Sequence, residues 1–423
     1  MVPANNYNGR VWQMRSLRAV ALSVLPFAAA YFVSYFFRTI NAVISETLAR
    51  DLKLDASQLG LLTSVYFLTF ASMQIPVGIL LDRYGPKRVQ SVLLLFSAAG
   101  AALFGFAHNF EILLTGRALI GFGVAASLTA GLKAITIWFP KDRLALINGC
   151  FITIGTLGVV FATLPAEWLL HFVGWKTLFE LLAVVCTVCA GAIFSIVPEP
   201  PSVGRVSKTN SIQIGRILTD ARFWRLAPIS MMCISTAWAL QGLWAAPWFA
   251  DVDRLSRSSI VGHLFAMSIA LSMAAMLLGI IVNQMRRQGV QAQVILGCVA
   301  GLLIAAQIAL IGNFPVPALI IWCVIASAGA ATVISYSAIA ELFPKEMSGQ
   351  ANAVLNTLHI GGAFVIQTSI GLVISHWTMN GGHYPVIAYK TAFCANLIIQ
   401  AIALGWFFVP FGRRTEPVAL EYP

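Results

Sequence analysis

The chain has 423 residues, of which 59% are hydrophobic and only 10% are charged. Soluble globular proteins average about 25% charged residues, so this composition excludes an ordinary soluble domain and predicts a polytopic membrane protein. The formal net charge of +11 would suit a nucleic-acid partner, but most lysines and arginines gather in segments on one side of the expected spans. That bias follows the positive-inside rule, so no nucleic acid is expected as a partner.

Twelve apolar stretches are long enough to cross a bilayer, because a spanning helix needs about 20 mostly apolar residues. They are residues 19–47, 57–81, 88–107, 110–137, 144–170, 175–197, 224–249, 258–282, 292–312, 317–342, 349–376 and 387–409. The basic bias predicts that both termini are cytoplasmic and that the protein lies in a cell membrane, with a bacterial inner membrane expected. The predicted fold class is an all-α polytopic membrane protein with twelve transmembrane helices.

The first span carries a positive charge. Tyr31, Tyr35, Arg38 and Ala42 follow one another at spacings of 4, 3 and 4 residues, which places them on one helix face. A charged residue inside a span is expected to face the bundle interior or a water-filled cavity, and it marks a candidate functional site. The second span adds Tyr66 as a further polar aromatic group.

The turn after the second span, residues 78–88, concentrates four charges between two apolar runs. These charges cannot lie in hydrocarbon, so the turn marks a bilayer surface; the plainer alternative is an ordinary basic loop. Its spacing G-x-x-x-D-R-x-G-x-K-R resembles the loop between helices 2 and 3 of the major facilitator superfamily, with Pro86 as a departure. The resemblance implies two six-helix bundles that open a central cavity alternately to each side. The gating residues that it implies are Gly78, Asp82, Arg83, Gly85 and Arg88.

The fourth span contains Arg117, followed by Gly121 and Gly123, whose small size permits close helix contact. Arg38, Arg117 and Lys133 are basic residues within the expected spans, whereas no acidic residue lies near a span centre. Two guanidinium groups without a nearby carboxylate predict an anion site, because arginine suits bidentate recognition of carboxylate or phosphate. The alternative is that each arginine hydrogen-bonds helix carbonyls and ties helices together.

Lys133 is harder to place than the two arginines. It lies sixteen residues after Arg117, which corresponds to about 160° around a helix. Both side chains cannot point squarely into one cavity, so a snorkelling or structural role for Lys133 stays open.

Weak internal repeats indicate two halves. The Phe-Pro-Lys at 139–141 recurs at 343–345, and the Gly-x-x-x-Asp at 78–82 recurs as Gly-x-x-x-Asn at 279–283. Matches at the same helix ends in the same order are typical of a duplicated transporter unit. A polar segment separates the halves, so we expect an N-terminal six-helix bundle over residues 1–197, a cytoplasmic linker over 198–223 and a C-terminal six-helix bundle over 224–423.

The two halves differ in chemistry, because the C-terminal half offers neutral groups where the N-terminal half offers cations. The predicted substrate-binding residues are Arg38, Arg117, Tyr35, Tyr66, Gln241, Trp244, Asn356 and His359. His359 lies mid-span and would be able to take up a proton in a coupled cycle, and its alternative is a hydrogen-bonded interior histidine. The alternative for each neutral group is simple packing in the core.

Enzyme motifs are missing from the sequence, which has no G-x-x-x-x-G-K-[ST], no H-E-x-x-H and no G-x-S-x-G. The seven cysteines are scattered, and the pair Cys186 and Cys189 has no accompanying ligand set, so neither a metal site nor a disulfide framework is predicted. We therefore expect no enzymatic activity, no metal and no cofactor.

A narrower resemblance concerns the anion:cation symporter branch of the same superfamily. Its motifs read here as Tyr-Phe-Phe-Arg at 35–38 and Q-I-P-V-G-I-L-L-D-R-Y-G at 74–85, and the Trp-Phe-Pro at 138–140 is also similar. The resemblance implies that Arg38 and Arg117 bind the substrate anion. Many proton-coupled members place acids where this chain has Phe37 and Val124. The coupling therefore stays open between a proton on His359, a proton carried on the substrate, and anion exchange.

The predicted function is secondary active transport of a small organic anion, such as a carboxylate or sugar acid, by alternating access and with ion- or proton-coupled uptake. The expected partners are a small anionic metabolite, protons or a counter-ion, and the lipid bilayer, and the protein is expected to be a monomer. Residues 117–126 are also similar to the drug:proton antiporter group, although the Gly-Pro pair of its fifth helix is missing. A ligand-binding membrane sensor without transport is a further alternative.

Overall fold

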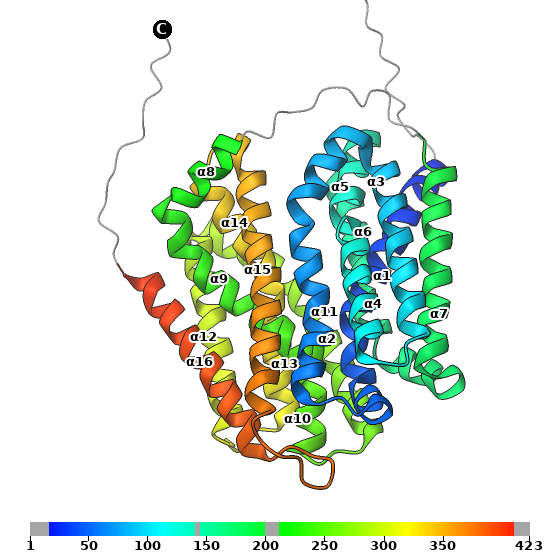
Figure 1. Ribbon diagram of the computed structural model, residues 1–423. Coiled ribbons are helices and arrows are strands. Elements are labelled where there is room, and N and C mark those ends of the chain that lie inside the picture. Colours follow the sequence, from blue (N-terminus) through cyan, green and yellow to red (C-terminus); the bar gives the residue numbers. More distant parts are fainter. Residues whose placement is uncertain (1–16, 140–143, 199–210, 410–423) are drawn as a thin grey trace, which may run out of the picture.

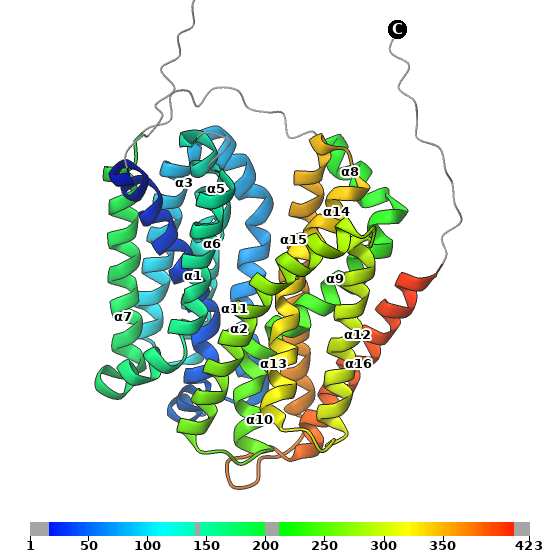
Figure 2. The ribbon, with the colours of Figure 1, turned by 180° about the vertical axis from the view of Figure 1, so that it is seen from behind.

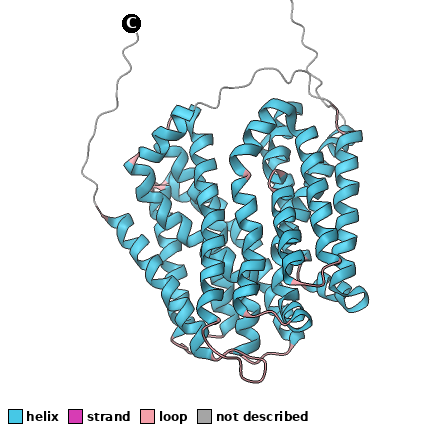
Figure 3. Ribbon diagram, viewed as in Figure 1, coloured by secondary structure: helices cyan, strands magenta, loops and turns pink. Residues whose placement is uncertain are grey.

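The computed structural model describes residues 17–139, 144–198 and 211–409 and is almost entirely helical in these ranges (Figure 3). The first group of helices comprises α1 (Leu17–Leu52), α2 (Ala56–Ser72), α3 (Gln74–Gly105), α4 (Phe110–Val124), α5 (Ser127–Trp138), α6 (Leu144–Phe161) and α7 (Leu164–Ile196). The second group comprises α8 (Ser211–Thr219), α9 (Ala221–Ala239), η1 (Leu240–Trp244), α10 (Ala245–Asp251), α11 (Arg257–Arg287), α12 (Ala292–Ile311), α13 (Ala318–Ala328), η2 (Gly329–Ala331), α14 (Thr332–Leu342), α15 (Lys345–Ile374) and α16 (Val386–Phe408).

The two groups stand side by side, with α1–α7 on the right of Figure 1 and most of α8–α16 on the left, and the reverse view in Figure 2 agrees. We call the end at which α8 lies the upper end and the end at which α10 lies the lower end, as drawn in Figure 1. Residues 199–210 of the predicted linker lie outside the described residues, and α8 with the start of α9 forms the rest of that segment. The exact domain boundaries therefore stay a prediction.

The described residues contain 10 helices long and apolar enough to cross a membrane by length and composition, and the sequence predicts twelve spans. The second and fifth expected spans account for the difference, because local breaks divide them. A break at Met73 ends α2 after 17 residues, and another beyond Phe161 ends α6. In each case a second short helix follows the break, at the start of α3 and at the start of α7.

Two glycines reverse the chain inside what are otherwise continuous helices. Gly85 has φ 77° and ψ 163° within α3, and Gly174 has φ 71° and ψ 170° within α7. Residues with a Cβ rarely adopt this region, so glycine is needed at both turns. Gly85 therefore separates the second expected span from the third, and Gly174 separates the fifth from the sixth.

The outward faces of the helices are apolar. Phe172 is 70% exposed, Met276 71% and Phe408 67%. Exposed apolar side chains on this scale would be a liability in water, whereas in a bilayer they contact lipid tails. The protein is thus a multi-pass membrane protein whose exposed faces suit lipid.

The two groups pack most closely along α2 and α15, where small residues meet. A Cβ added to Gly371 would lie 2.6 Å from the Ala56 carbonyl oxygen, and one added to Gly60 would lie 3.1 Å from the Gln367 carbonyl oxygen. Small residues let helix backbones approach in membranes, where van der Waals packing rather than the hydrophobic effect drives association. Nearby hydrogen bonds join Gln367 Nε2 to Thr63 Oγ1 (2.6 Å) and the Ser64 and Thr368 hydroxyls (2.7 Å).

This packing predicts that Gly371→Ala forces α2 and α15 apart, because the new methyl group would meet a backbone oxygen. Overpacking of this kind costs about 1–3 kcal/mol, measured as a loss in the free energy of unfolding in detergent micelles. Gly361→Ala, on the same helix but with nothing within 4 Å of the new Cβ, is the matched control and should be neutral or slightly stabilising. Equal effects of the two substitutions would contradict the close approach.

Candidate substrate site

Arg38 lies within α1, where the two groups of helices meet. Its guanidinium carbon is 4.8 Å from the centroid of the Tyr35 ring on the same helix and 4.2 Å from the centroid of the Trp238 ring on α9. Cation–π contacts of this kind stabilise a cation by about 0.5–2 kcal/mol. The Arg38 side chain is partly exposed. Across the described part of the chain, its N–H groups have neither an acidic partner nor a hydrogen-bond acceptor, so they are available to a ligand.

Trp238 is not among the residues predicted from the sequence. Its position three residues before Gln241 places both on one helix face, and this spacing is the signal that would have found it. A Cβ added to Gly329 would lie 3.2 Å from Cδ1 of the indole, so glycine at that position makes room for the ring. The π-helix η1 follows directly, and such irregular turns are frequent at functional sites. Sequence pattern alone does not reveal that this ring contacts Arg38 from the other half.

His359 lies behind Trp238 and is fully buried. Its ring centroid is 6.4 Å from that of Trp238 and 6.0 Å from that of Tyr336. Its Nε2 lies 2.7 Å from the Ser230 hydroxyl, which donates to Ser335, whose own hydroxyl donates to the Ala331 carbonyl. Because the Ser230 proton is used, His359 must donate from Nε2. Its Nδ1 is left as an acceptor that has no partner in the described residues.

Asn356 and Tyr336 connect the surroundings of His359 to the N-terminal group through hydrogen bonds. The Tyr336 hydroxyl donates to Asn356 Oδ1 at 2.7 Å, and Asn356 Nδ2 donates to Gln74 Oε1 at 3.1 Å. All three side chains are partly exposed. Tyr35 also receives a hydrogen bond from the Tyr31 hydroxyl at 3.3 Å. The groups around Arg38 are therefore neutral hydroxyls and amides, contributed by both halves.

Arg117 lies in the interior of the N-terminal group and has no exposed surface. Its Nη1 and Nη2 both donate to the Phe37 carbonyl oxygen, at 3.1 and 3.2 Å. Its guanidinium carbon lies 5.3 Å from the Tyr66 ring centroid and 5.9 Å from that of Phe104. The guanidinium thus joins α4 to α1 at the residue that precedes Arg38.

Tyr66, Gln241 and Trp244 are all buried. The Tyr66 hydroxyl donates to the Ser34 carbonyl at 3.2 Å, and Trp244 Nε1 donates to the Gln367 carbonyl at 3.3 Å. Gln241 Nε2 has no partner among the described residues. The structure therefore brings Arg38, Tyr35, His359 and Asn356 of the predicted set around one place, and it places these three in the surrounding packing.

Lys133 pairs with Asp82, and both residues belong to the N-terminal group. The amine of Lys133, on α5, donates to Asp82 Oδ1 on α3. Of the other predicted gating residues, Gly85 makes the turn, the Arg83 guanidinium lies 5.2 Å from the centroid of the exposed Tyr84 ring, and Gly78 has open space around its Cα. Arg88 is exposed. The side chain of Lys133 therefore points toward Asp82.

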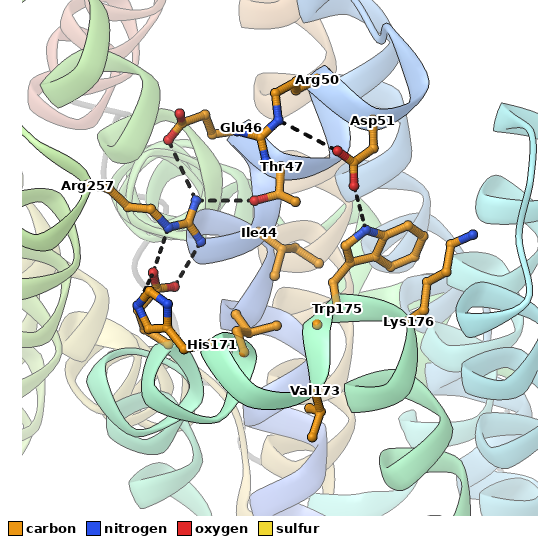
Figure 4. A pocket seen from close by; sticks show the side chains of 13 residues that line it. Ile44, Glu46, Thr47, Arg50, Asp51, His171, Val173, Trp175, Lys176 and Arg257 are labelled. Atoms are coloured by element: carbon orange, nitrogen blue, oxygen red, sulfur yellow. Dashed lines mark hydrogen bonds and ion pairs between the residues drawn. The ribbon is translucent and has the colours of Figure 1, made fainter.

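At the lower end an ion pair connects the halves. Arg257 on α11 donates Nε to Glu167 Oε1 at 2.6 Å and Nη2 to Glu167 Oε2 at 2.9 Å, and Nη1 reaches Thr47 at 3.2 Å. Figure 4 shows Arg257 with Glu46 and Thr47 at a cavity of about 530 Å³, and Glu46 lies 3.7 Å from Arg257. A bidentate arginine–carboxylate contact is the strongest form of this interaction. The lower end is therefore held together by charge as well as by packing.

A second lower-end contact involves the loop before α16. The backbone N–H of Ala56, at the start of α2, donates to the Tyr384 hydroxyl at 3.0 Å. Tyr384 is itself fixed by Asp251, which accepts its backbone N–H at 3.1 Å and the Tyr389 hydroxyl at 2.6 Å. Burial raises the pKa of the Tyr384 phenol, so this hydroxyl stays neutral near pH 7. The residues that the structure describes contain no cluster of three or more His, Cys, Asp or Glu suited to a metal ion.

Two known proteins are similar to this chain in sequence. The chain is 29% identical over 184 residues to an Escherichia coli (strain K12) protein named "Probable L-galactonate transporter", covering 44% of this chain and 40% of that one. It is 29% identical over 195 residues to the "Probable sulfoacetate transporter SauU" of Cupriavidus necator, covering 45% of each. These matches thus span less than half the length of either relative.

The fold itself matches along almost the whole chain. A crystal structure of a bacterial homologue of the human lysosomal transporter Spinster, described as inward-facing and unoccupied, superposes with a TM-score of 0.77 at 18% identity, covering 93% of this chain and 97% of that one. The family model for the Major Facilitator Superfamily matches residues 27–367. This chain therefore belongs to the Major Facilitator Superfamily.

Proposed function

We propose that this protein moves a small organic anion across a membrane by alternating access, and that Arg38 binds the anion. The observation that carries the proposal is the guanidinium of Arg38, which lies at the meeting of the halves, partly exposed and with no acceptor in the described structure. A charge inside a membrane protein is costly unless it has a partner or serves a pathway. An anionic substrate would supply that partner.

Arg117 has a different role in this proposal. Because both of its terminal nitrogens are committed to the Phe37 carbonyl, it positions the turn of α1 that carries Arg38 and does not itself bind the anion. This differs from the role that the family resemblance implies. It also accounts for the burial of Arg117, since a guanidinium that binds a transported anion must be reachable from solution.

The relatives support the anion class. L-galactonate and sulfoacetate, which appear in the names of the two relatives, are both small organic anions. They differ in charge, because galactonate carries one carboxylate and sulfoacetate carries a carboxylate and a sulfonate. The relatives therefore support an anion as substrate, but their names do not indicate how many charges it carries. That number has to be inferred from the residues of this chain.

The contacts at the lower end support alternating access. If the positive-inside bias sets the topology, the lower end faces outside, and the conformer is one closed to the outside by Glu167–Arg257 and the α2–α15 packing. Outward opening would require the ion pair to break. We further propose ion- or proton-coupled uptake by a monomer in the inner membrane, with Asp82 and Lys133 fixing the gating turn at the cytoplasmic side.

Arg38→Gln should weaken anion binding at least about 30-fold, which corresponds to about 2 kcal/mol for loss of one partner of a desolvated charge pair. Binding would be measured by titration of the purified protein with sugar acids. The free energy of unfolding should fall by no more than the cation–π contacts contribute, about 0.5–2 kcal/mol, because no hydrogen-bond acceptor is lost. Arg216→Gln, an exposed site on α8, controls for net charge. Unaltered affinity in a folded Arg38→Gln protein would remove Arg38 from the site.

Arg117→Gln should show the opposite signature, with the free energy of unfolding reduced by about 1.5–3 kcal/mol through loss of charged hydrogen bonds to Phe37. Any loss of affinity should then follow from misplacement of Arg38. Denaturant unfolding of the two arginine variants in the same detergent separates these roles.

Asp82→Asn and Lys133→Met should each slow transport in proteoliposomes while leaving equilibrium binding intact. The ion pair lies away from Arg38 and orders the turn at Gly85. Residues of one ion pair are not independent, so the double variant should be no slower than either single variant. Normal turnover in both single variants would count against a gating role.

Glu167→Gln should shift the protein toward conformers that are open at the lower end. In this ion pair Glu167 is buried and Arg257 is partly exposed, so loss of the pair should cost about 1 kcal/mol or more, which changes the ratio of conformers about fivefold or more. Spin labels at His108 and Asn313, on opposite halves, would report this as an increased long-distance population. Glu111→Gln, an exposed acid on α4, is the control, and an unchanged distance distribution for Glu167→Gln would argue against the ion pair as a latch.

A further inference from the structure

Two of the three cations within the expected spans have a hydrogen-bond or ion-pair partner in the protein itself. Arg117 donates to the Phe37 carbonyl, and Lys133 is paired with Asp82. Of these three cations of the spans, Arg38 alone has no hydrogen bond or ion pair within the described residues. Arg117 keeps its charge, and its Nε has no partner in the described residues, but its side chain has no exposed surface. Among these three cations, Arg38 is therefore the one that offers N–H groups to a ligand at the meeting of the halves.

The form of that charge fits one carboxylate. A guanidinium carries its N–H groups in its own plane, in a fork that matches the two oxygens of a carboxylate. The guanidinium carbon lies 4.8 and 4.2 Å from the ring centroids of Tyr35 and Trp238, while its N–H groups lack an acceptor among the described residues. One carboxylate would satisfy the fork.

The other groups at this level are neutral. Tyr336, Asn356 and Gln74 are partly exposed and joined by hydrogen bonds of 2.7 and 3.1 Å across the halves. Hydroxyls and amides exchange hydrogen bonds readily with the hydroxyls of a polyol chain. A second carboxylate placed against them would lose its water without gaining a cation, and an unpaired ion taken out of water is strongly disfavoured.

We infer that this protein selects monoanionic, polyhydroxylated carboxylates over dianions of the same length. This inference rests on the proposed function and adds the charge and chemical class of the substrate. Arg38 takes the single carboxylate, and Tyr336, Asn356 and Gln74 face the uncharged hydroxylated part. The full burial of Arg117 and the pairing of Lys133 with Asp82 leave neither cation available to a second carboxylate.

The test compares matched acids that differ only at one end. Gluconate and glucarate share a six-carbon chain, with an alcohol or a carboxylate at the far end, and galactonate and galactarate form a second pair. Binding of each to the purified full-length protein would be measured by calorimetric titration at pH 7. In at least one pair the monoacid should bind tenfold or more tightly than its diacid, and Arg38→Gln should abolish the binding.

Each outcome has a distinct meaning. Diacids that bind as tightly as, or more tightly than, their monoacids in an Arg38-dependent manner would overturn the charge selectivity and leave anion transport standing. Binding by none of the acids, or binding unaffected by Arg38→Gln, would overturn the proposed function together with this inference.

A second variant adds charge where the structure has none. Asn356→Lys places an amine beside Tyr336 and Gln74, and it should reduce the monoacid preference severalfold. Asn356→Met, with a similar stem and no charge, is the matched control and should leave the preference in place. Equal ratios of monoacid to diacid affinity in a folded Asn356→Lys protein and in the control would argue against a neutral environment for the far end of the substrate. The comparison of acids on the unaltered protein tests the inference even where the lysine variant does not fold.

Discussion

The cost of an unpaired charge within a membrane governs how this protein is built. A guanidinium or ammonium in a span needs a compensating group, and the chain provides one for Arg117 in the Phe37 carbonyl and one for Lys133 in Asp82. Arg38 is treated differently, since aromatic rings from both halves contact it and no acceptor in the described residues faces it. Under the proposed function, an anionic substrate would pair with this charge where the two halves meet.

The same constraint explains why the halves are held by small and specific contacts. Lipid tails are as apolar as leucine, so burying apolar surface between helices stabilises little. Close approach of Gly60 and Gly371 and the hydrogen bonds of Thr63 and Ser64 therefore help to hold α2 against α15. At the lower end, Glu167 and Arg257 form a strong contact that breaks as a unit. Contacts that are few and discrete are what a protein with two packed states requires.

Features that follow from hydrophobic length and backbone geometry could be predicted from the sequence. The spans depend on apolar runs, and the turn at Gly85 depends on a glycine at φ 77°, so both leave a direct signal. The helix breaks at Met73 and beyond Phe161 also have a local signal, because Pro76 and Pro165 lack the N–H that would bond to the carbonyls of Ser72 and Phe161, four residues earlier. This is why two expected spans prove to be divided.

The candidate site was only partly accessible to sequence reasoning, for a physical reason. A cation in a span can be recognised as such, but its partner cannot when that partner is a backbone carbonyl, since every residue has one. Arg38 and Arg117 are therefore alike in sequence and opposite in structure, one partly exposed and one committed to Phe37. The partner of Lys133 could not be predicted for a different reason, because Asp82 lies 51 positions away in the sequence.

Trp238 connects these observations to movement. Arg38 and Tyr35 belong to the N-terminal half, whereas the ring that lies 4.2 Å from the guanidinium carbon belongs to the C-terminal half and rests against His359. Any rotation of one half against the other must change that contact, while the contact with Tyr35, three residues away on the same helix, is preserved. An anion on the N–H groups of Arg38 lowers the need for the indole as a partner of the positive charge. Under the proposed function, binding and rearrangement would be coupled directly through the contact of Arg38 with Trp238.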